Sequence, residues 1–516
     1  MKKSAKRIMA ALLACGMLAG TAGCGGSTER TADSDNTLTY WVEFGNQVSA
    51  GVKNFGELPQ FKKLQEDLGV KIEYTHPVLG QAESQLNLML ASDEVTDIIE
   101  YGFYNYPGGP QKAIDDGCII KLNDVIDKYC PNLKKYLQEH PEVDKMVKTD
   151  DGNYYCFPGI YDDDYLLVYS GLIIRDDFLK KVGMERPETI DEWENVLTAF
   201  KDKLGIANPL ELGSWGLYAI TQAYGAIPQL YIDDGKVKYG PMESGYKDAL
   251  ATLNRWYSKG LIDKNIASLE GSTINQNILN GDAGALFGNT GSGIGTLMNG
   301  LKNVEGASLA AAKYPVLKKG DTPMYGQRVF PYSPFGSASI STKCKNVELA
   351  AKVLDYGYSE EGRMLYNFGI EGESYDMKDG YPTYTDKVTH NENGKSMSEM
   401  LYYYTTPNGI GPFLRDKRYM EQFAALPQQK ESIEIWSQTD AEKHMLPMVT
   451  LTSDESSEIS GIANDIKTQV DSMTMKIITG VEPIDSYDTM IKTLQGMGVD
   501  KYIETNQKAY DRYLVK

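Results

Sequence analysis

The strongest constraint on the fold is an alternation of strand-like and helix-like segments near the start of the chain. Short β-branched and aromatic runs at 38–42, 70–74 and 96–101 predict strands, and amphipathic spacing predicts helices at 61–68 and 81–91. Strands separated by single helices run parallel through right-handed crossovers. The pattern therefore predicts an α/β lobe with a parallel sheet.

The same pattern resumes after a polar turn at 150–153. A strand-like run at 166–175 leads into a predicted helix at 175–182, and Thr189 with Glu192 forms a capping box at the start of another helix. From about residue 397 the chain is mostly helical. Because 516 residues exceed what one hydrophobic core usually supports, we expect two α/β lobes and a helical C-terminal region.

The N-terminus is a targeting signal and is excluded from the fold. A basic start (1–7) and an apolar run (8–22) precede Cys24, so residues 1–23 are the predicted signal peptide. The sequence GTAGCGGS resembles a bacterial lipobox, with Thr21 where Leu is preferred, which makes Cys24 the predicted lipidation site. Residues 24–36 are the expected flexible tether. An ordinary secreted protein with an incidental cysteine is the alternative.

The charge of the chain excludes several classes of partner. The formal net charge is -19, and removing the signal leaves 48 basic against 71 acidic residues, a net charge of -23. This balance argues against nucleic acid, which is bound through phosphate neutralisation, and against a basic patch on anionic lipid. A neutral or cationic small ligand remains open.

Motifs for catalysis, metals and cofactors are missing from the sequence. The four histidines are far apart, and there is no HExxH, Walker A or GxSxG pattern. The glycine run 288–295 lacks the lysine of a phosphate loop, and Asp162–Asp164 lacks the spacing of a calcium loop. A Cys118–Cys130 disulfide stays open, with Cys156 and Cys344 as further thiols. We predict no catalytic residue, no metal and no cofactor.

Several long motifs resemble one protein family. They are NLMLASDEVTDIIEY (87–101), DGNYYCFP (151–158), GLIIRDDFLKKVGMERPETIDEW (171–193), YSKGLIDK (257–264), SISTKCKNVELAAKVLDYGYSEEGRMLYNFGIEGESY (339–375) and GMGVDKYIETNQKAYDRY (496–513). These stretches, taken in their order along the chain, resemble the bacterial extracellular solute-binding proteins of family 1, in their large lipoprotein branch. Asp93–Thr96 departs from the family's Gly-Asp-Leu-Pro.

The resemblance implies a two-lobed, periplasmic-binding-protein-like fold with a hinge that the chain crosses more than once. Each lobe is expected to be a mainly parallel sheet flanked by helices. Residues 37–160 and 313–372 are assigned to the first lobe, and 161–312 and 373–516 to the second lobe with its helical extension.

The expected ligand site lies in loops after the strands, where open parallel sheets bind ligands. By the resemblance, Tyr101 occupies the place of a ring that stacks on sugar, whereas Trp193 and Trp256 lie on amphipathic helices and are expected in the core. The predicted ligand-binding residues are Trp41, Glu43, Asn46, Tyr101, Tyr104, Tyr161, Asp162, Trp215, Phe287 and Asn289.

The resemblance predicts a lipid-anchored component of an ABC importer on the extracytoplasmic face of the cell membrane, in a Gram-positive bacterium. The favoured ligand is a neutral oligosaccharide, delivered by hinged closure to the transmembrane subunits of a permease. We expect a monomer that binds no nucleic acid. The alternatives are a binder of peptides or other small solutes and a surface enzyme that acts on polysaccharide.

Overall fold

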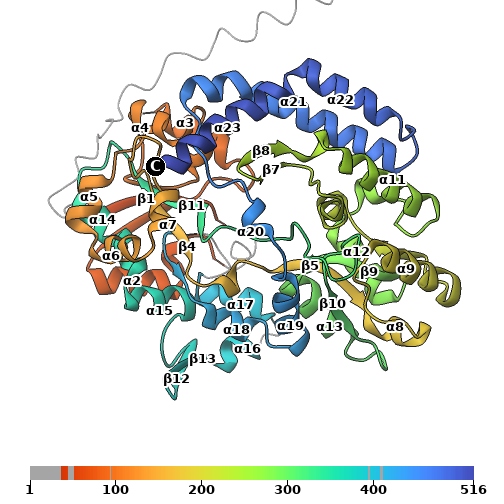
Figure 1. The fold of residues 1–516 in the computed structure, drawn as a ribbon. Coiled ribbons are helices and arrows are strands. Elements are labelled where there is room, and N and C mark those ends of the chain that lie inside the picture. Colours follow the sequence, from red (N-terminus) through yellow and green to blue (C-terminus); the bar gives the residue numbers. More distant parts are fainter. Residues whose placement is uncertain (1–35, 45–51, 93, 393–394, 407–410) are drawn as a thin grey trace, which may run out of the picture.

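A computed structural model describes residues 36–44, 52–92, 94–392, 395–406 and 411–516. The predicted signal peptide and lipidation site (Cys24) and the predicted ligand residue Asn46 lie outside these ranges. Two sheets, each flanked by helices, stand side by side and are joined by helices above and below in the view of Figure 1. No helix in the described ranges has both the length and the apolar character needed to span a membrane.

The first lobe is built on a six-stranded sheet in the order β14-β4-β11-β3-β1-β2. Its strands are β1 (Thr37–Val42), β2 (Lys71–Thr75), β3 (Ile98–Glu100), β4 (Phe157–Tyr161), β11 (Tyr332–Ile340) and β14 (Leu414–Arg415). Only β11 runs against the other five strands. The helices around it are α2 (Pro59–Leu68), α3 (Ala82–Leu90), α4 (Gly109–Asp115), α5 (Asn123–Tyr129), α6 (Pro131–Glu139), α7 (Pro141–Met146), α14 (Val347–Asp355) and α15 (Glu360–Phe368).

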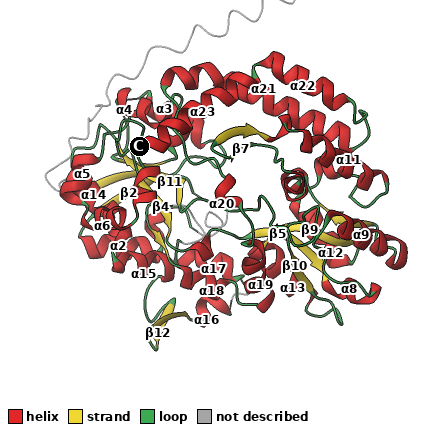
Figure 2. Ribbon diagram, viewed as in Figure 1, coloured by secondary structure: helices red, strands yellow, loops and turns green. Residues whose placement is uncertain are grey.

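The second lobe contains a four-stranded sheet in the order β10-β5-β9-β6. Its strands are β5 (Ser170–Arg175), β6 (Asn208–Glu211), β9 (Ala283–Asn289) and β10 (Leu309–Ala312), and a separate hairpin consists of β7 (Leu230–Asp233) and β8 (Lys236–Tyr239). The flanking helices are α8 (Asp176–Val182), α9 (Ile190–Leu204), α10 (Tyr218–Thr221), α11 (Ser244–Ser258), α12 (Gly271–Asn280) and α13 (Thr296–Leu301). Helices enclose the strands of both lobes (Figure 2), which is the expected architecture.

The chain crosses between the lobes at 162–169, 313–331, 416–426 and 437–452. The first two crossings lead into β5 and β11, the one strand in each sheet that runs against its neighbours. A strand that enters from the other lobe starts at the edge facing that lobe, whereas the remaining strands end there. The reversed strands are therefore a consequence of the hinge, and the expected mainly parallel direction holds for the rest.

The part of the chain after residue 372 differs from its predicted placement. The prediction assigned 373–516 to the second lobe, but β14 pairs with β4 in the first sheet. The segments β12 (Tyr375–Lys378), β13 (Tyr381–Tyr384), α16 (Asp386–Thr389), α17 (Met397–Tyr404) and α18 (Lys417–Phe423) lie around a small apolar cluster of their own. Strand pairing with a distant segment leaves no mark in local periodicity, so the sequence could not show this division.

Helix α19 (Pro427–Trp436) returns the chain to the second lobe and packs on β10. The fully buried indole of Trp436 donates its N–H toward the carbonyls of Leu172 and Ala312, at 3.3 and 3.2 Å. A Cβ on Gly171 would lie 2.4 Å from the Trp436 ring, so only glycine permits this close approach. Then follow α20 (Ala441–His444), α21 (Ser453–Ile478), α22 (Ser486–Met497) and α23 (Val499–Val515).

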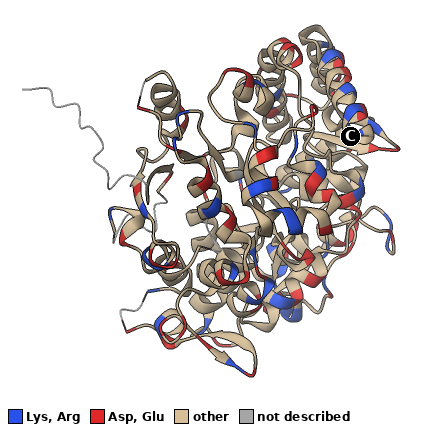
Figure 3. Ribbon diagram, turned by 90° about the vertical axis from the view of Figure 1, so that its left-hand side faces the viewer, with Lys and Arg blue, Asp and Glu red and all other residues tan. Residues whose placement is uncertain are grey.

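Several local predictions are confirmed. Thr189 and Glu192 form the capping box of α9, and Trp193 and Trp256 are fully buried. The four cysteines in the described part of the chain are free, so the Cys118–Cys130 bridge is not formed. Acidic and basic residues are interspersed along the same helices in Figure 3, and many pair at i,i+4 spacing, as Lys467 and Asp471 do on α21.

Candidate ligand-binding site between the lobes

The register of the two sheets places their strand ends at facing edges. β4 ends at Tyr161, and after eight intervening residues β5 begins at Ser170, which pairs with Asn289 at the end of β9. Eight extended residues span at most about 28 Å. Because β1, β3 and β4 end at one edge and β6 and β9 end at the other, the loops after these strands all point toward the boundary between the lobes.

The first-lobe edge carries a supported aromatic side chain. Trp41 at the end of β1 is only 3% exposed and meets the ring of Tyr101 edge-on, with ring centroids 6.3 Å apart. Tyr101 is half-buried, and burial together with the nearby carboxylate of Glu83 raises its pKa. Its phenol therefore stays protonated and can donate a hydrogen bond. Glu43, also half-buried, comes directly after β1, the strand that contains Trp41.

The second-lobe edge carries an exposed aromatic side chain. Trp215, in the 3-10 turn Ser214–Gly216 after β6, is 48% exposed. Its ring stands on Phe287 with centroids 5.0 Å apart and an interplanar angle of 77°. A Cβ on Gly216 would lie 2.9 Å from the Cβ of Phe287, so glycine allows this turn to approach β9 closely. Trp215 thus leaves about half of its surface open to solvent while Phe287 supports its ring.

Phe287 itself has a different place from the one predicted. The prediction offered its ring to the ligand, but Phe287 is only 3% exposed and lies beneath Trp215 and Tyr218. Asn289, two residues later and therefore on the same face of β9, is exposed at the strand end. The Asn289 amide accepts a hydrogen bond from the Ser170 hydroxyl at 2.5 Å and donates toward Ser292 Oγ at 3.3 Å.

Tyr104 also differs from its predicted place. Its hydroxyl donates a hydrogen bond to the carbonyl of Val449 at 2.8 Å, and burial raises its pKa to about 12. The side chain therefore holds the crossing at 437–452 against the first lobe. The chain after β3 forms a 3-10 turn, Phe103–Asn105, that directs Tyr104 away from Tyr101. No periodicity in the sequence reports this partner, which lies 345 residues away.

The acidic run at the first crossing is occupied by hinge contacts. Asp162 pairs with Arg363 at 2.7 Å, Asp163 with Lys417 at 3.0 Å, and Asp164 with Arg328 at 3.0 Å. Among the described residues, no group of three or more His, Cys, Asp or Glu side chains could hold a metal ion. These carboxylates bind neighbouring segments of the chain, and each joins residues that are far apart in the sequence.

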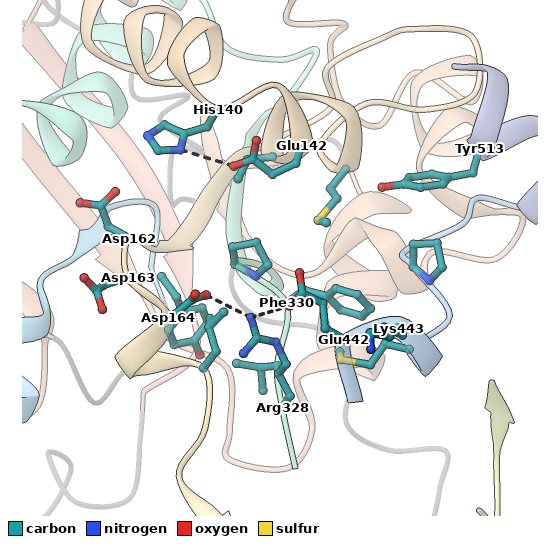
Figure 4. A pocket seen from close by; sticks show the side chains of 18 of the residues that line it. His140, Glu142, Asp162, Asp163, Asp164, Arg328, Phe330, Glu442, Lys443 and Tyr513 are labelled. Carbon is teal, nitrogen blue, oxygen red and sulfur yellow. Dashed lines mark hydrogen bonds and ion pairs between the residues drawn. The ribbon is translucent and has the colours of Figure 1, made fainter. Parts of the chain in front are cut away.

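A cavity of about 540 Å³ lies beside the crossings (Figure 4). Both lobes line it: His140 and Glu142 come from the first lobe, Arg328 and Glu442 from crossings, and Tyr513 from α23. Tyr161 and Asp162 are the two predicted site residues in its wall. Trp41, Tyr101 and Trp215 are not among its lining residues, so the structure separates the predicted set into the facing edges and this hinge cavity.

Sequence reasoning missed the cavity because its walls come from distant parts of the chain. The stacked rings of Tyr136 and His140, with centroids 4.1 Å apart, lie on α6 and directly after it. Tyr513 belongs to a helix whose periodicity shows an apolar face but not what that face contacts. The acidic run Asp162–Asp164 was the one local signal that marked this region.

Comparison with known proteins shows the family. The model of the bacterial extracellular solute-binding proteins matches residues 47–364, more than half of the chain. Lipoprotein LipO of Bacillus subtilis is 26% identical over 411 residues, which cover 76% of this chain and 77% of LipO. The fructooligosaccharide ABC transporter substrate-binding protein FusA of Streptococcus pneumoniae is 26% identical over 488 residues, covering 88% of this chain and 86% of FusA.

Solved structures agree on the fold. The alginate-binding protein AlgQ2 without calcium ion has a TM-score of 0.74 at 25% identity, covering 92% of this chain and 98% of AlgQ2. An extracellular solute-binding protein from Bifidobacterium longum subsp. infantis has a TM-score of 0.76 at 19% identity, covering 94% of this chain and 99% of that one. The two-lobed arrangement and the family match lead to one conclusion: this chain belongs to the bacterial extracellular solute-binding proteins.

Proposed function

We propose that this protein captures a neutral oligosaccharide between its two lobes and delivers it to the permease of an ABC importer. The observation that carries the proposal is Trp215, a large indole that is 48% exposed at the interlobe edge although Phe287 supports it from below. A solvated aromatic face on a rigid base suits the apolar C–H face of a sugar ring.

The opposite edge offers the complementary groups. Tyr101, backed by Trp41, supplies a second ring with a protonated hydroxyl, and Glu43 supplies a carboxylate that can accept bonds from sugar hydroxyls. Closure of the lobes would bring these groups and Trp215 onto one ligand. Binding would then stabilise the closed form, and no bond is made or broken in the ligand.

The charge of the predicted contacts favours an uncharged ligand. Trp41, Glu43, Tyr101, Trp215 and Asn289 include no Lys or Arg that could bind a uronate or a phosphate. The names of the relatives support a carbohydrate: fructooligosaccharide for FusA, polygalacturonan and rhamnogalacturonan for YtcQ of Bacillus subtilis, and alginate for AlgQ2. Of these named ligands, the fructooligosaccharide is the uncharged kind that we expect here.

The proposed location is the extracytoplasmic face of a Gram-positive cell membrane. The mature chain would begin at Cys24, which carries the lipid, and residues 24–36 would tether the two lobes to the bilayer. The name lipoprotein LipO is consistent with this anchor. The protein would act as a monomer, with the transmembrane subunits of a permease as its partner.

A thermal-unfolding screen of the intact protein tests the proposal. The panel contains neutral oligosaccharides of several linkages and lengths, oligogalacturonates, and short peptides. We expect a rise in the unfolding midpoint with one class of neutral oligosaccharide, because a ligand that binds only the folded state stabilises it. Stabilisation by peptides alone, or release of shorter sugars during long incubation, would overturn the proposal.

A further inference from the structure

The C-terminal strap, residues 449–516, forms a second connection between the lobes in addition to the crossings. Its helix α21 has 26 residues and is about 39 Å long at 1.5 Å per residue. Helix α23 lies against it, with an ion pair of 2.7 Å between Lys501 and Glu458. In Figure 1 these helices arch over the top of the molecule, from the first-lobe side to the second.

The strap is fixed to the second lobe through apolar packing. Ile466, Val470, Ile477, Tyr487 and Leu494 are buried in the same hydrophobic cluster as the second-lobe sheet. Hydrogen bonds add to this packing: the Asn254 amide donates to the Ile477 carbonyl at 2.9 Å, and the Tyr487 hydroxyl donates to the Glu243 carbonyl at 2.9 Å. This end of the strap therefore belongs to the core of the second lobe.

The contact with the first lobe is smaller and mainly polar. Arg512 on α23 donates to Asp150 of the first lobe at 2.7 Å and to Glu455 of α21 at 2.6 Å. The Thr450 hydroxyl donates to the other carboxylate oxygen of Asp150, at 2.6 Å. Val449, Ala509 and Tyr513 form a small apolar cluster here that is separate from the first-lobe core.

The strap packs on the second lobe through apolar side chains and on the first lobe mainly through polar ones. This difference determines which of the two contacts can separate in water. Separating the strap from the second lobe would expose large apolar side chains, whereas separating Arg512 from Asp150 exposes groups that water can solvate. Both are already partly exposed, with side-chain exposures of 33% and 20%. Rotation of the lobes about the crossings moves Asp150 relative to α23, because α23 packs on the second-lobe strand β8, where Gln507 accepts a hydrogen bond from the Val237 N–H at 2.7 Å.

We propose that the contact of Arg512 with Asp150 is an ionic latch that holds the lobes in the open arrangement seen here. Trp215 is 48% exposed in this arrangement, so the proposed ligand contact is open to water. The latch would lower the fraction of closed protein before the sugar arrives. The apparent dissociation constant rises in proportion as that fraction falls. This inference rests on the proposed capture of a sugar between the lobes.

The first arm of the test measures lobe arrangement without any sugar. Small-angle X-ray scattering compares the radius of gyration of wild type with Asp150→Asn and Arg512→Gln. We expect both variants to contract, and the double variant to contract no further than either single variant, because the two residues act through one contact. Asp471→Asn is the matched control, since its ion pair with Lys467 lies within α21 and joins no lobes.

The second arm uses the sugar found by the thermal screen. We expect an apparent dissociation constant three- to tenfold lower in both latch variants, and no change in Asp471→Asn. Wild type at about 1 M salt, where the Debye length is about 3 Å, should contract as the variants do, so the test does not depend on how well a variant folds. An unchanged radius of gyration in the variants and at high salt would overturn the latch; failure of wild type to bind any sugar would instead overturn the proposed function.

Discussion

Replacing Trp215 by alanine should weaken ligand binding while leaving the protein stable. A tryptophan contributes roughly 200 Å² of contact surface, and the 48% exposure of Trp215 leaves roughly 100 Å² available to a sugar. At about 25 cal/mol per Å², burying that area contributes about 2.5 kcal/mol, which corresponds to about a sixtyfold change in the dissociation constant. The rest of the ring rests on Phe287, so some loss of stability, about 1 kcal/mol, is also expected.

Isothermal titration with the stabilising sugar measures the effect. Trp215→Phe retains a ring and should lose less than tenfold. Met377→Ala is the matched control, because Met377 is also exposed, at 43%, but lies on the β12–β13 hairpin. A dissociation constant within twofold of wild type in a folded Trp215→Ala variant would refute the assignment of this side chain to the ligand site.

Three further predictions concern buried charge and the anchor. Burial raises the pKa of Glu100 to about 8, while the hydroxyl of Tyr40 donates to it at 2.7 Å. Because its folded pKa lies above the unfolded value of about 4.3, Glu100 favours folding at low pH and loses that contribution as pH rises through 8. In urea unfolding, Glu100→Gln should therefore be more stable than wild type at about pH 9 and lose that advantage near pH 5. An equal difference in stability at both pH values would contradict the raised pKa of Glu100. Asp416, whose side chain is 1% exposed, binds Arg418 at 2.5 Å and Arg363 at 2.8 Å. Asp416→Asn should lower the free energy of unfolding by about 3 kcal/mol, whereas the surface control Asp471→Asn should lower it by less than about 0.5 kcal/mol. Cys24→Ser should move the protein from the membrane fraction of cells to the soluble fraction, and retention in the membrane would exclude a lipid anchor at this position.

Local structure was predictable wherever a short stretch of sequence determines it. The strands predicted at 38–42 and 70–74 are β1 and β2, within one residue at each end, and the Thr189–Glu192 capping box begins α9. Trp215, predicted as a ligand-binding residue, is exposed as that role requires, and its position between Gly213 and Gly216 gives the indole little local packing. In each case the determining contacts lie within a few residues of one another.

The remaining features depend on contacts between distant residues. Tyr104 meets Val449, Arg512 meets Asp150, and Trp436 fills the space above Gly171, each across more than 250 residues. Helical periodicity shows that α23 has an apolar face but does not identify its neighbour. The same limit explains why Phe287 was predicted to contact the ligand. Its place after a strand could be read from the sequence, but the rings of Trp215 and Tyr218 that cover it could not.

Hydrogen exchange with and without the bound sugar locates the ligand on the chain, so it decides whether the sugar binds between the lobes. We expect slower exchange at both edges at once, around Trp41 and Tyr101 in the first lobe and around Trp215 and Asn289 in the second. Protection confined to one lobe, or to the hinge cavity around Asp164, Glu442 and Tyr513, would contradict capture between the two edges.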